Sequence, residues 1–202
     1  DHWETLIAGL MQEGVRRVRI TGGEPLLFRG VVEVVARLKA LGVEDLALTT
    51  NGVRLDALAR PLRAAGLQRV TVSLDSLSPE RFARITRGGD LGAVLRGVDA
   101  AIDAGFDELK TNTVVLRGDN DDELVDIAQW AWARGVTPRF IEVMGVGEGG
   151  NIWREKLVSA REQRMRLAAL LADDVGERDP DRGPSRYVRA RDGSGRRVGS
   201  IT

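Results

Sequence analysis

The 202-residue chain contains no cysteine and a single histidine, His2. Without cysteine it can form no disulfide and offers no thiolate ligand to zinc or to an iron–sulfur cluster. His2 alone cannot complete a metal site, and its position in the first turn of an expected helix favours a solvated side chain. We therefore predict that the residues of this chain hold no metal ion.

Long apolar runs and an excess of charge of one sign are also missing. No stretch of about 18 consecutive apolar residues occurs, so the pattern predicts no membrane-spanning helix. Thirty basic residues balance thirty acidic residues, and net charge therefore favours no polyanionic or polycationic partner. The length suits one domain, or one domain with an appendage.

Alternating helical and strand-like segments dominate the sequence. The strand-like segments are mostly apolar throughout, which is typical of parallel strands that helices cover. The pattern predicts an α/β fold, either an open doubly wound sheet or a closed or partial (β/α) barrel. Strands are expected at 16–21, 44–50, 69–75, 109–116 and 137–144, and helices at 3–13, 31–41, 55–65, from 78, at 91–104, 121–133 and 159–172.

Short local patterns mark several helix starts and one hairpin. Ser78 followed by Pro79 predicts a capped helix start. The residue pairs Asn120 with Glu123 and Ser159 with Glu162 both have capping-box spacing. Asp192-Gly193 predicts a hairpin between two strand-like runs, and the polar stretch 176–185 is expected to be a loop.

Polar residues gather where the expected strands end, which is where parallel α/β folds place their active sites. The first strand, which we interpret as buried, runs into Gly22-Gly23-Glu24-Pro25, and two glycines there suggest that something approaches the backbone closely. The second strand ends in Thr49-Thr50-Asn51, which capping of the next helix would also explain. The third ends in Ser73 and Asp75, for which turn formation is the alternative.

Three cations fall within expected strands: Arg19, Lys110 and Arg139. A charge in a buried strand costs several kcal/mol unless it is paired, and a salt bridge to Glu142 is the main structural alternative to a binding role. If the sheet curves, the cations would face a common interior and suit a small polyanion such as a nucleoside triphosphate. The stretch 145–150 matches the spacing of a dinucleotide-binding loop, but it lacks the required strand before it and helix after it.

Several motifs resemble those of the radical S-adenosylmethionine (SAM) superfamily: TGGEPLL at 21–27, TTNG at 49–52 and VSLD at 72–75. The later stretches LKTNTVVLRGDNDDEL at 109–124 and RFIEVM at 139–144 are similar to the GTP 3′,8-cyclases of molybdenum cofactor biosynthesis, the MoaA family. The resemblance extends in order from about residue 3 to the end of the chain.

The resemblance implies a fold and a set of site residues. The implied fold is a partial (β/α)₆ TIM-like barrel containing strands two to six, over 1–157, followed by a C-terminal helix and hairpin region over 158–202. It assigns no catalytic residue. The implied SAM-binding residues are Gly22, Gly23, Glu24, Pro25, Ser73 and Met144, and the implied GTP-binding residues are Arg19, Thr49, Lys110 and Arg139.

The resemblance also implies the chemistry. A [4Fe-4S] cluster and SAM would generate a radical that converts GTP to (8S)-3′,8-cyclo-7,8-dihydroguanosine 5′-triphosphate, a lyase reaction. The family's cluster cysteines are absent from this chain, so we expect truncation at both ends and no activity from the chain alone. The expected partners are GTP and SAM in the cytoplasm, with neither nucleic acid nor membrane, and a homodimer stays open. The alternatives are another radical SAM enzyme, such as one that modifies peptides, and a cluster-free nucleotide-binding barrel without catalysis.

Overall fold

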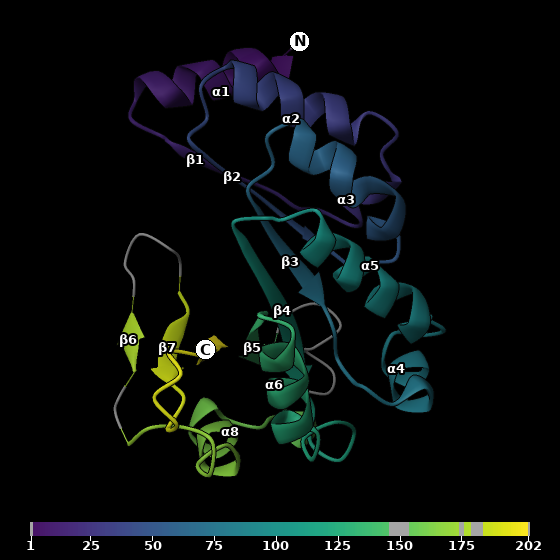
Figure 1. Cartoon of the computed structure of the whole chain (residues 1–202), viewed down its shortest axis with the longest axis vertical. Helices are drawn as coiled ribbons and strands as arrows, with labels where there is room; N and C mark the ends of the chain where they lie inside the picture. Colours follow the sequence, from purple (N-terminus) through teal and green to yellow (C-terminus); the bar gives the residue numbers. More distant parts are fainter. Residues whose placement is uncertain (1, 146–153, 174–175, 179–183, 202) are drawn as a thin grey trace. The chain divides into compact units, whose positions relative to one another are not determined.

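The computed structural model describes residues 2–145, 154–173, 176–178 and 184–201 (Figure 1). The side chain of His2 and residues 146–150 of the glycine-rich loop lie outside the described residues. The chain divides into two compact units, one formed by Asp1–Ser73 with Gly92–Leu109 and the other by Leu74–Leu91 with Lys110–Thr202. Each unit has its own β/α elements.

The first unit contains three parallel strands. Ile20 of the first strand lies opposite Leu48, and Leu48 lies opposite Val70. Apolar residues recur at helical spacing in the helices, as in Val31, Val35 and Leu38, and these side chains are buried. Its elements are α1 (His2–Gln12), β1 (Arg17–Ile20), η1 (Pro25–Leu27), α2 (Val31–Ala40), β2 (Asp45–Thr50), α3 (Leu55–Ala64), β3 (Arg69–Ser73) and, from Gly92 onward, α5 (Leu91–Asp103).

The interpretation of β1 as a buried strand is wrong. Val18 and Ile20 are half-buried, whereas Arg17 and Arg19 are exposed. Within the described part of this unit β1 pairs only with β2, so one of its edges is not covered by another strand. The argument from the cost of burying a charge therefore does not apply to Arg19.

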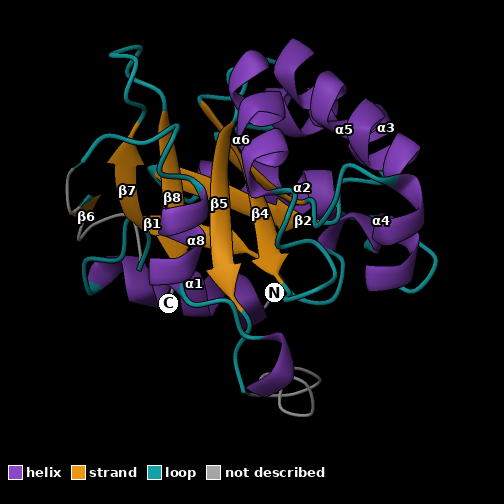
Figure 2. Ribbon diagram, turned by 90° about the horizontal axis from the view of Figure 1, so that it is seen from below, coloured by secondary structure: helices purple, strands orange, loops and turns teal. Residues whose placement is uncertain are grey.

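The second unit combines parallel and antiparallel strands. The strands β4 and β5 are parallel, β8 joins β5 in parallel, and β7 pairs antiparallel with β8 and β6. Figure 2 shows β7, β8, β5 and β4 side by side in that order. The elements are α4 (Pro79–Ile85), β4 (Glu108–Val115, from Lys110 onward), α6 (Leu124–Ala133), β5 (Thr137–Glu142), α8 (Ala160–Arg166), β6 (Glu177–Arg178), β7 (Arg186–Arg189) and β8 (Arg197–Ile201).

One apolar core holds the second unit together. It joins side chains from β4, α6, β5, the segments on either side of α8 and the C-terminal hairpin, and Phe140, Leu124 and Ile127 are among its most completely buried members. Burial of large apolar side chains is the main stabilising contribution, at about 1.5–3 kcal/mol for each. The core comprises Val115, Leu124, Ile127, Ala128, Trp132, Phe140, Val158, Leu167, Leu171, Val188, Ala190 and Val198.

Two of the three predicted helix starts are confirmed. The hydroxyl groups of Ser78 and Ser159 accept hydrogen bonds from backbone N–H groups in the first turns of α4 and α8. The capping box at Asn120 is wrong, because α6 begins at Leu124 and the Asn120 side chain bonds elsewhere. Helix α8 also ends earlier than predicted, at Arg166.

The predicted α/β class with parallel strands and a C-terminal hairpin is confirmed. The described helices are short, and α5 with 13 residues is an example of the longer ones. No helix in the described part of the chain combines the length and the hydropathy needed to cross a bilayer.

Candidate functional site

The two glycines after β1 are both exposed, but they differ in backbone conformation. Gly22 has φ +140°, a value that L-residues rarely adopt, whereas Gly23 is not among the residues with positive φ. A Cβ atom added at either position would meet no described protein atom within 4 Å. The conformation thus explains Gly22, and neither strain nor crowding within the described protein explains Gly23.

Glu24 fixes this loop to the end of β2. Its Oε1 accepts hydrogen bonds from the Leu26 backbone N–H at 2.9 Å and the Thr50 hydroxyl at 2.6 Å. Its Oε2 accepts the Asn51 backbone N–H at 2.6 Å. Pro25 begins the short helix η1 immediately afterwards. The four residues predicted to bind SAM here, 22–25, thus form a turn that the hydrogen bonds of the Glu24 carboxylate hold in place.

The residues at the end of β2 have two different uses. The Thr50 hydroxyl accepts the Gly52 N–H at 3.1 Å, and the Asn51 Oδ1 atom accepts the Val53 N–H at 3.0 Å, so both shape a turn. Neither residue caps α3, because the residue before that helix is Arg54 and no side chain caps it. Thr49 instead accepts a hydrogen bond from Arg19 Nη1 at 3.1 Å. The structure thus brings together two of the residues predicted to bind GTP.

Ser73 and Met144, both predicted SAM contacts, stand at the carboxyl ends of strands. Ser73 is the last residue of β3 and is half-buried. Met144 lies two residues beyond β5, and 61% of its surface is exposed. An exposed methionine of this size is a flexible apolar surface that a planar ligand group could contact.

Lys110 and Arg139 are buried in the second unit, with exposed fractions of 3% and 7%. Arg139 donates from Nε to Asn112 Oδ1 at 2.9 Å and from Nη1 to the Ser185 hydroxyl at 3.4 Å. The structural alternative, a salt bridge from Arg139 to Glu142, is wrong. The Glu142 carboxylate instead accepts a hydrogen bond from the Ala160 backbone N–H. Positions 139 and 142 in one strand point to opposite faces of the sheet.

Tyr187, the only tyrosine of the chain, lies against the buried lysine. The Lys110 Nζ atom is 5.3 Å from the centre of its ring. Burial raises the pKa of Tyr187, but the polar contact of its hydroxyl with Lys110 and the positive charges of Lys110 and Arg139 outweigh burial and leave this pKa below its ordinary value. The sequence analysis did not select Tyr187 as a site residue. The one feature that could have indicated it is its place beside basic residues in the expected hairpin strand.

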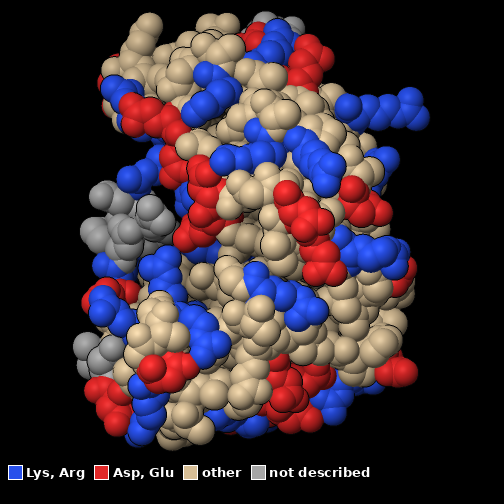
Figure 3. Space-filling model, viewed as in Figure 1, with Lys and Arg blue, Asp and Glu red and all other residues tan. Residues whose placement is uncertain are grey.

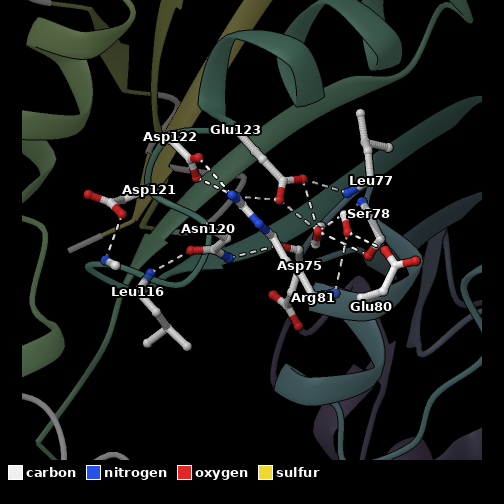
Figure 4. Close-up of polar contacts among 12 residues, drawn as sticks. Asp75, Leu77, Ser78, Glu80, Arg81, Leu116, Asn120, Asp121, Asp122 and Glu123 are labelled. Atoms are coloured by element: carbon white, nitrogen blue, oxygen red, sulfur yellow. Dashed lines mark hydrogen bonds and ion pairs between the residues drawn. The ribbon is translucent and has the colours of Figure 1, made fainter.

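A separate polar network joins the segment after β3 to the end of β4 (Figure 4). Asp75 Oδ1 accepts the Val114 N–H at 2.9 Å, and burial raises the pKa of Asp75 to about 6. The Asn120 side chain donates to the carbonyl groups of Asp75 and Val114 and accepts the Leu116 N–H. These hydrogen bonds therefore hold the segment after β3 and the loop after β4 in place.

Glu123 belongs to the same network. Its carboxylate accepts the Ser76 hydroxyl at 2.8 Å, the Leu77 N–H at 2.8 Å and Arg81 Nη1 at 3.0 Å (Figure 4). These partners are more than 40 residues away in sequence, as with Ser76 and Arg81, so a local capping pattern could not reveal them. Buried polar groups of this kind must be satisfied, which explains why Glu123 does not close a capping box.

Charge on the molecular surface is mixed. Basic and acidic side chains are interspersed over the face shown in Figure 3. Among the residues that the structure describes, no group of three or more histidine, aspartate or glutamate side chains is placed to hold a metal ion. Because the sequence contains no cysteine, the residues present do not fit an iron–sulfur cluster.

Comparison with known proteins identifies the family. Residues 4–131 match the radical SAM superfamily, and the chain belongs to that superfamily. It is 45% identical over 191 residues to a protein of Heliobacterium modesticaldum named GTP 3′,8-cyclase, covering 93% of this chain and 58% of the relative. A protein of the same name from Pelotomaculum thermopropionicum is 42% identical over 201 residues, covering 98% of this chain and 62% of the relative. The chain thus spans about three fifths of the length of these relatives.

Solved structures show the same fold. Streptococcus suis SuiB bound to its precursor peptide matches 82% of this chain and 38% of that chain, with a TM-score of 0.66 and 14% identity. A domain of pyruvate-formate lyase-activating enzyme from Bacteroides vulgatus matches 75% of this chain and 90% of that domain, with a TM-score of 0.59 and 14% identity. At this identity the likeness concerns fold alone, and it confirms the predicted radical SAM type of α/β architecture.

Proposed function

We propose that this chain is the central part of a GTP 3′,8-cyclase and that it binds GTP and SAM. The observation that carries the proposal is the pair of almost fully buried cations, Lys110 and Arg139, on adjacent parallel strands. Burying two cations is costly unless an anion or strong acceptors offset the cost, and a triphosphate would do so. The 42–46% identity to proteins named GTP 3′,8-cyclase supports the same proposal.

The proposed GTP-binding residues form two pairs, each described within its own unit. Arg19 with its acceptor Thr49 belongs to the first unit, whereas Lys110 and Arg139 belong to the second. Lysine supplies a compact point charge, and arginine supplies a planar fork of donors that matches phosphate oxygens. Their proposed part in the reaction is to bind and orient the nucleotide, which lowers the entropic cost of the chemical step.

The proposed SAM contacts are Gly22, Gly23, Glu24, Pro25, Ser73 and Met144. The backbone at Gly23 would approach the ligand where a side chain would intrude, and the turn that Glu24 holds would keep that backbone in place. In the whole enzyme SAM and an iron–sulfur cluster supply the radical chemistry. The cluster does not fit the residues of this chain, so the proposal assigns ligand binding to the chain and no radical step.

The proposal also covers the reaction and the cellular location of the full-length protein. The reaction would convert GTP to (8S)-3′,8-cyclo-7,8-dihydroguanosine 5′-triphosphate for molybdenum cofactor biosynthesis in the cytoplasm. Neither nucleic acid nor a membrane is proposed as a partner, and the oligomeric state, including a homodimer, stays open.

Calorimetric titration of the 202-residue chain with GTP and then with SAM tests the proposal. Replacing a charged hydrogen-bonding group typically removes about 1.5–3 kcal/mol, so Lys110→Ala should weaken GTP binding roughly 10- to 100-fold. The same change should leave SAM affinity within about twofold of wild type. Lys39→Ala, at an exposed lysine of α2, is the matched control and should change neither affinity.

Two outcomes would overturn the assignment. Equal losses of GTP and SAM affinity in Lys110→Ala would show that the lysine supports the fold and has no particular relation to GTP. No saturable binding of GTP by the wild-type chain would remove the proposed role of the chain in GTP binding.

A further inference from the structure

One of the two buried cations, Arg139, belongs to a row of residues that crosses four strands of the second unit, and Lys110 lies two residues before the first member of that row, Asn112, on β4. Asn112 of β4 lies opposite Arg139 of β5, Arg139 lies opposite Gly199 of β8, and Gly199 lies opposite Tyr187 of β7. Directly paired residues share one face of a sheet. The row therefore places the Arg139 and Tyr187 side chains on the same face, with the glycine between them.

Gly199 leaves the space that these two side chains occupy. A Cβ atom at this position would lie 2.7 Å from Arg139 Cγ, 3.2 Å from Arg139 Cδ and 2.8 Å from Tyr187 Cε1. Gly199 is not among the residues with positive φ, so backbone conformation does not require a glycine here. The close approach of the arginine stem and the tyrosine ring requires it.

Tyr187 lies between cations from two other strands. The centre of its ring is 5.3 Å from Lys110 Nζ and 4.5 Å from Arg197 Cζ. Both distances suit a cation–π interaction. The tyrosine is 6% exposed, and its hydroxyl oxygen makes no hydrogen bond of ordinary length and angle to the described residues. Its ring and the polar contact of its hydroxyl with Lys110 both act on the lysine at close range.

We propose that Tyr187 and Gly199 are positioning residues that fix Lys110 and Arg139 for binding the phosphate chain of the nucleotide. A lysine side chain has four rotatable bonds, and holding its ammonium group in place before the ligand arrives removes an entropic cost from binding. Gly199 makes this arrangement possible by admitting both the ring and the arginine stem. The inference rests on the proposed function, because it takes the phosphates of GTP as the ligand of Lys110.

Substitutions at Tyr187 separate positioning from a general structural role. Tyr187→Leu should weaken GTP binding roughly 3- to 30-fold, the value of a buried cation–π contact, and should lower the ratio of GTP affinity to GMP affinity. Tyr187→Phe keeps the ring and should stay within about threefold of wild type. Arg189→Ala, at an exposed position of the same strand, is the control and should change neither affinity.

Gly199→Ala should reproduce the effect of Tyr187→Leu, since the new Cβ displaces the Arg139 stem or the ring. Gly9→Ala, where an added Cβ meets no described atom within 4 Å, is its control. Tyr187→Leu in the Lys110→Ala background should weaken GTP binding no further, because residues that act through one partner are not additive.

The outcomes distinguish this inference from the proposed function. Equal loss of GTP and GMP affinity in Tyr187→Leu, or full additivity with Lys110→Ala, would overturn the positioning role. GTP binding that Lys110→Ala removes and Tyr187→Leu leaves intact would overturn this inference alone. Absence of GTP binding in the wild-type chain would overturn the proposed function first.

Discussion

The two adjacent glycines after β1 have different physical causes. Gly22 adopts a backbone conformation that a side chain would strain, so folding alone accounts for it. Gly23 is under no such constraint, and the space beside it contains no described protein atom within 4 Å. The proposed SAM site accounts for Gly23 as a place where a ligand approaches the backbone.

Substitutions at the two glycines should therefore separate folding from binding. Gly22→Ala should lower the free energy of unfolding by about 1 kcal/mol or more, because alanine is strained at that φ. Gly23→Val should abolish SAM binding while changing the free energy of unfolding by less than about 0.5 kcal/mol. Urea denaturation and SAM titration measure the two effects. Survival of SAM binding in Gly23→Val would show that nothing approaches this backbone closely.

At the scale of elements, local sequence signals predicted most helix and strand ends, and the errors arose where long-range contacts decide the structure. The ends of most helices and strands follow from apolar periodicity and glycine stops, as in α2 and β3, which lie within two residues of their predicted ends. The start of α6 was wrong because Asn120 and Glu123 have partners far away in sequence. The pattern that resembles a capping box contains no information about those partners.

Glu24 gives a test at the same scale, because it ties η1 to the end of β2. Glu24→Gln keeps the size of the side chain, but it removes the charge and turns one acceptor oxygen into a donor. The free energy of unfolding should fall by about 1–3 kcal/mol, and amide exchange should accelerate most at Leu26 and Asn51. Glu33→Gln, with an exposed carboxylate on α2, is the control. Unchanged exchange at both amides would contradict the role of Glu24 in holding this turn in place.

At the scale of the whole molecule, the sequence predicted the α/β class, the succession of elements and the strands that contain Arg19, Lys110 and Arg139. It could not predict that β8 joins β5 in parallel, because strand pairing depends on contacts distant in sequence. The part played by Tyr187 was hidden for the same reason, since its position beside Lys110 exists only once β7 and β8 have been added to the sheet.

The stability of the whole chain should also depend on the ionisation of Asp75. Burial raises the pKa of this carboxyl from 3.8 to about 6, so the folded state favours its protonated form. Protonation of Asp75 therefore stabilises the fold fully below about pH 4, and this contribution is lost as the pH rises through about 6. A shift of about two pKa units corresponds to roughly 3 kcal/mol.

Asp75→Asn isolates this contribution, because asparagine keeps an oxygen that can accept the Val114 N–H and has no proton to lose. Urea denaturation of both proteins between about pH 4 and pH 8 should show the wild type losing up to about 3 kcal/mol relative to the variant. Other carboxylates with lowered pKa values, such as Glu162 and Asp192, affect both proteins equally and cancel in the difference. Parallel stability curves would show that Asp75 is ionised in the folded protein at no cost, and that water or a cation reaches its carboxylate.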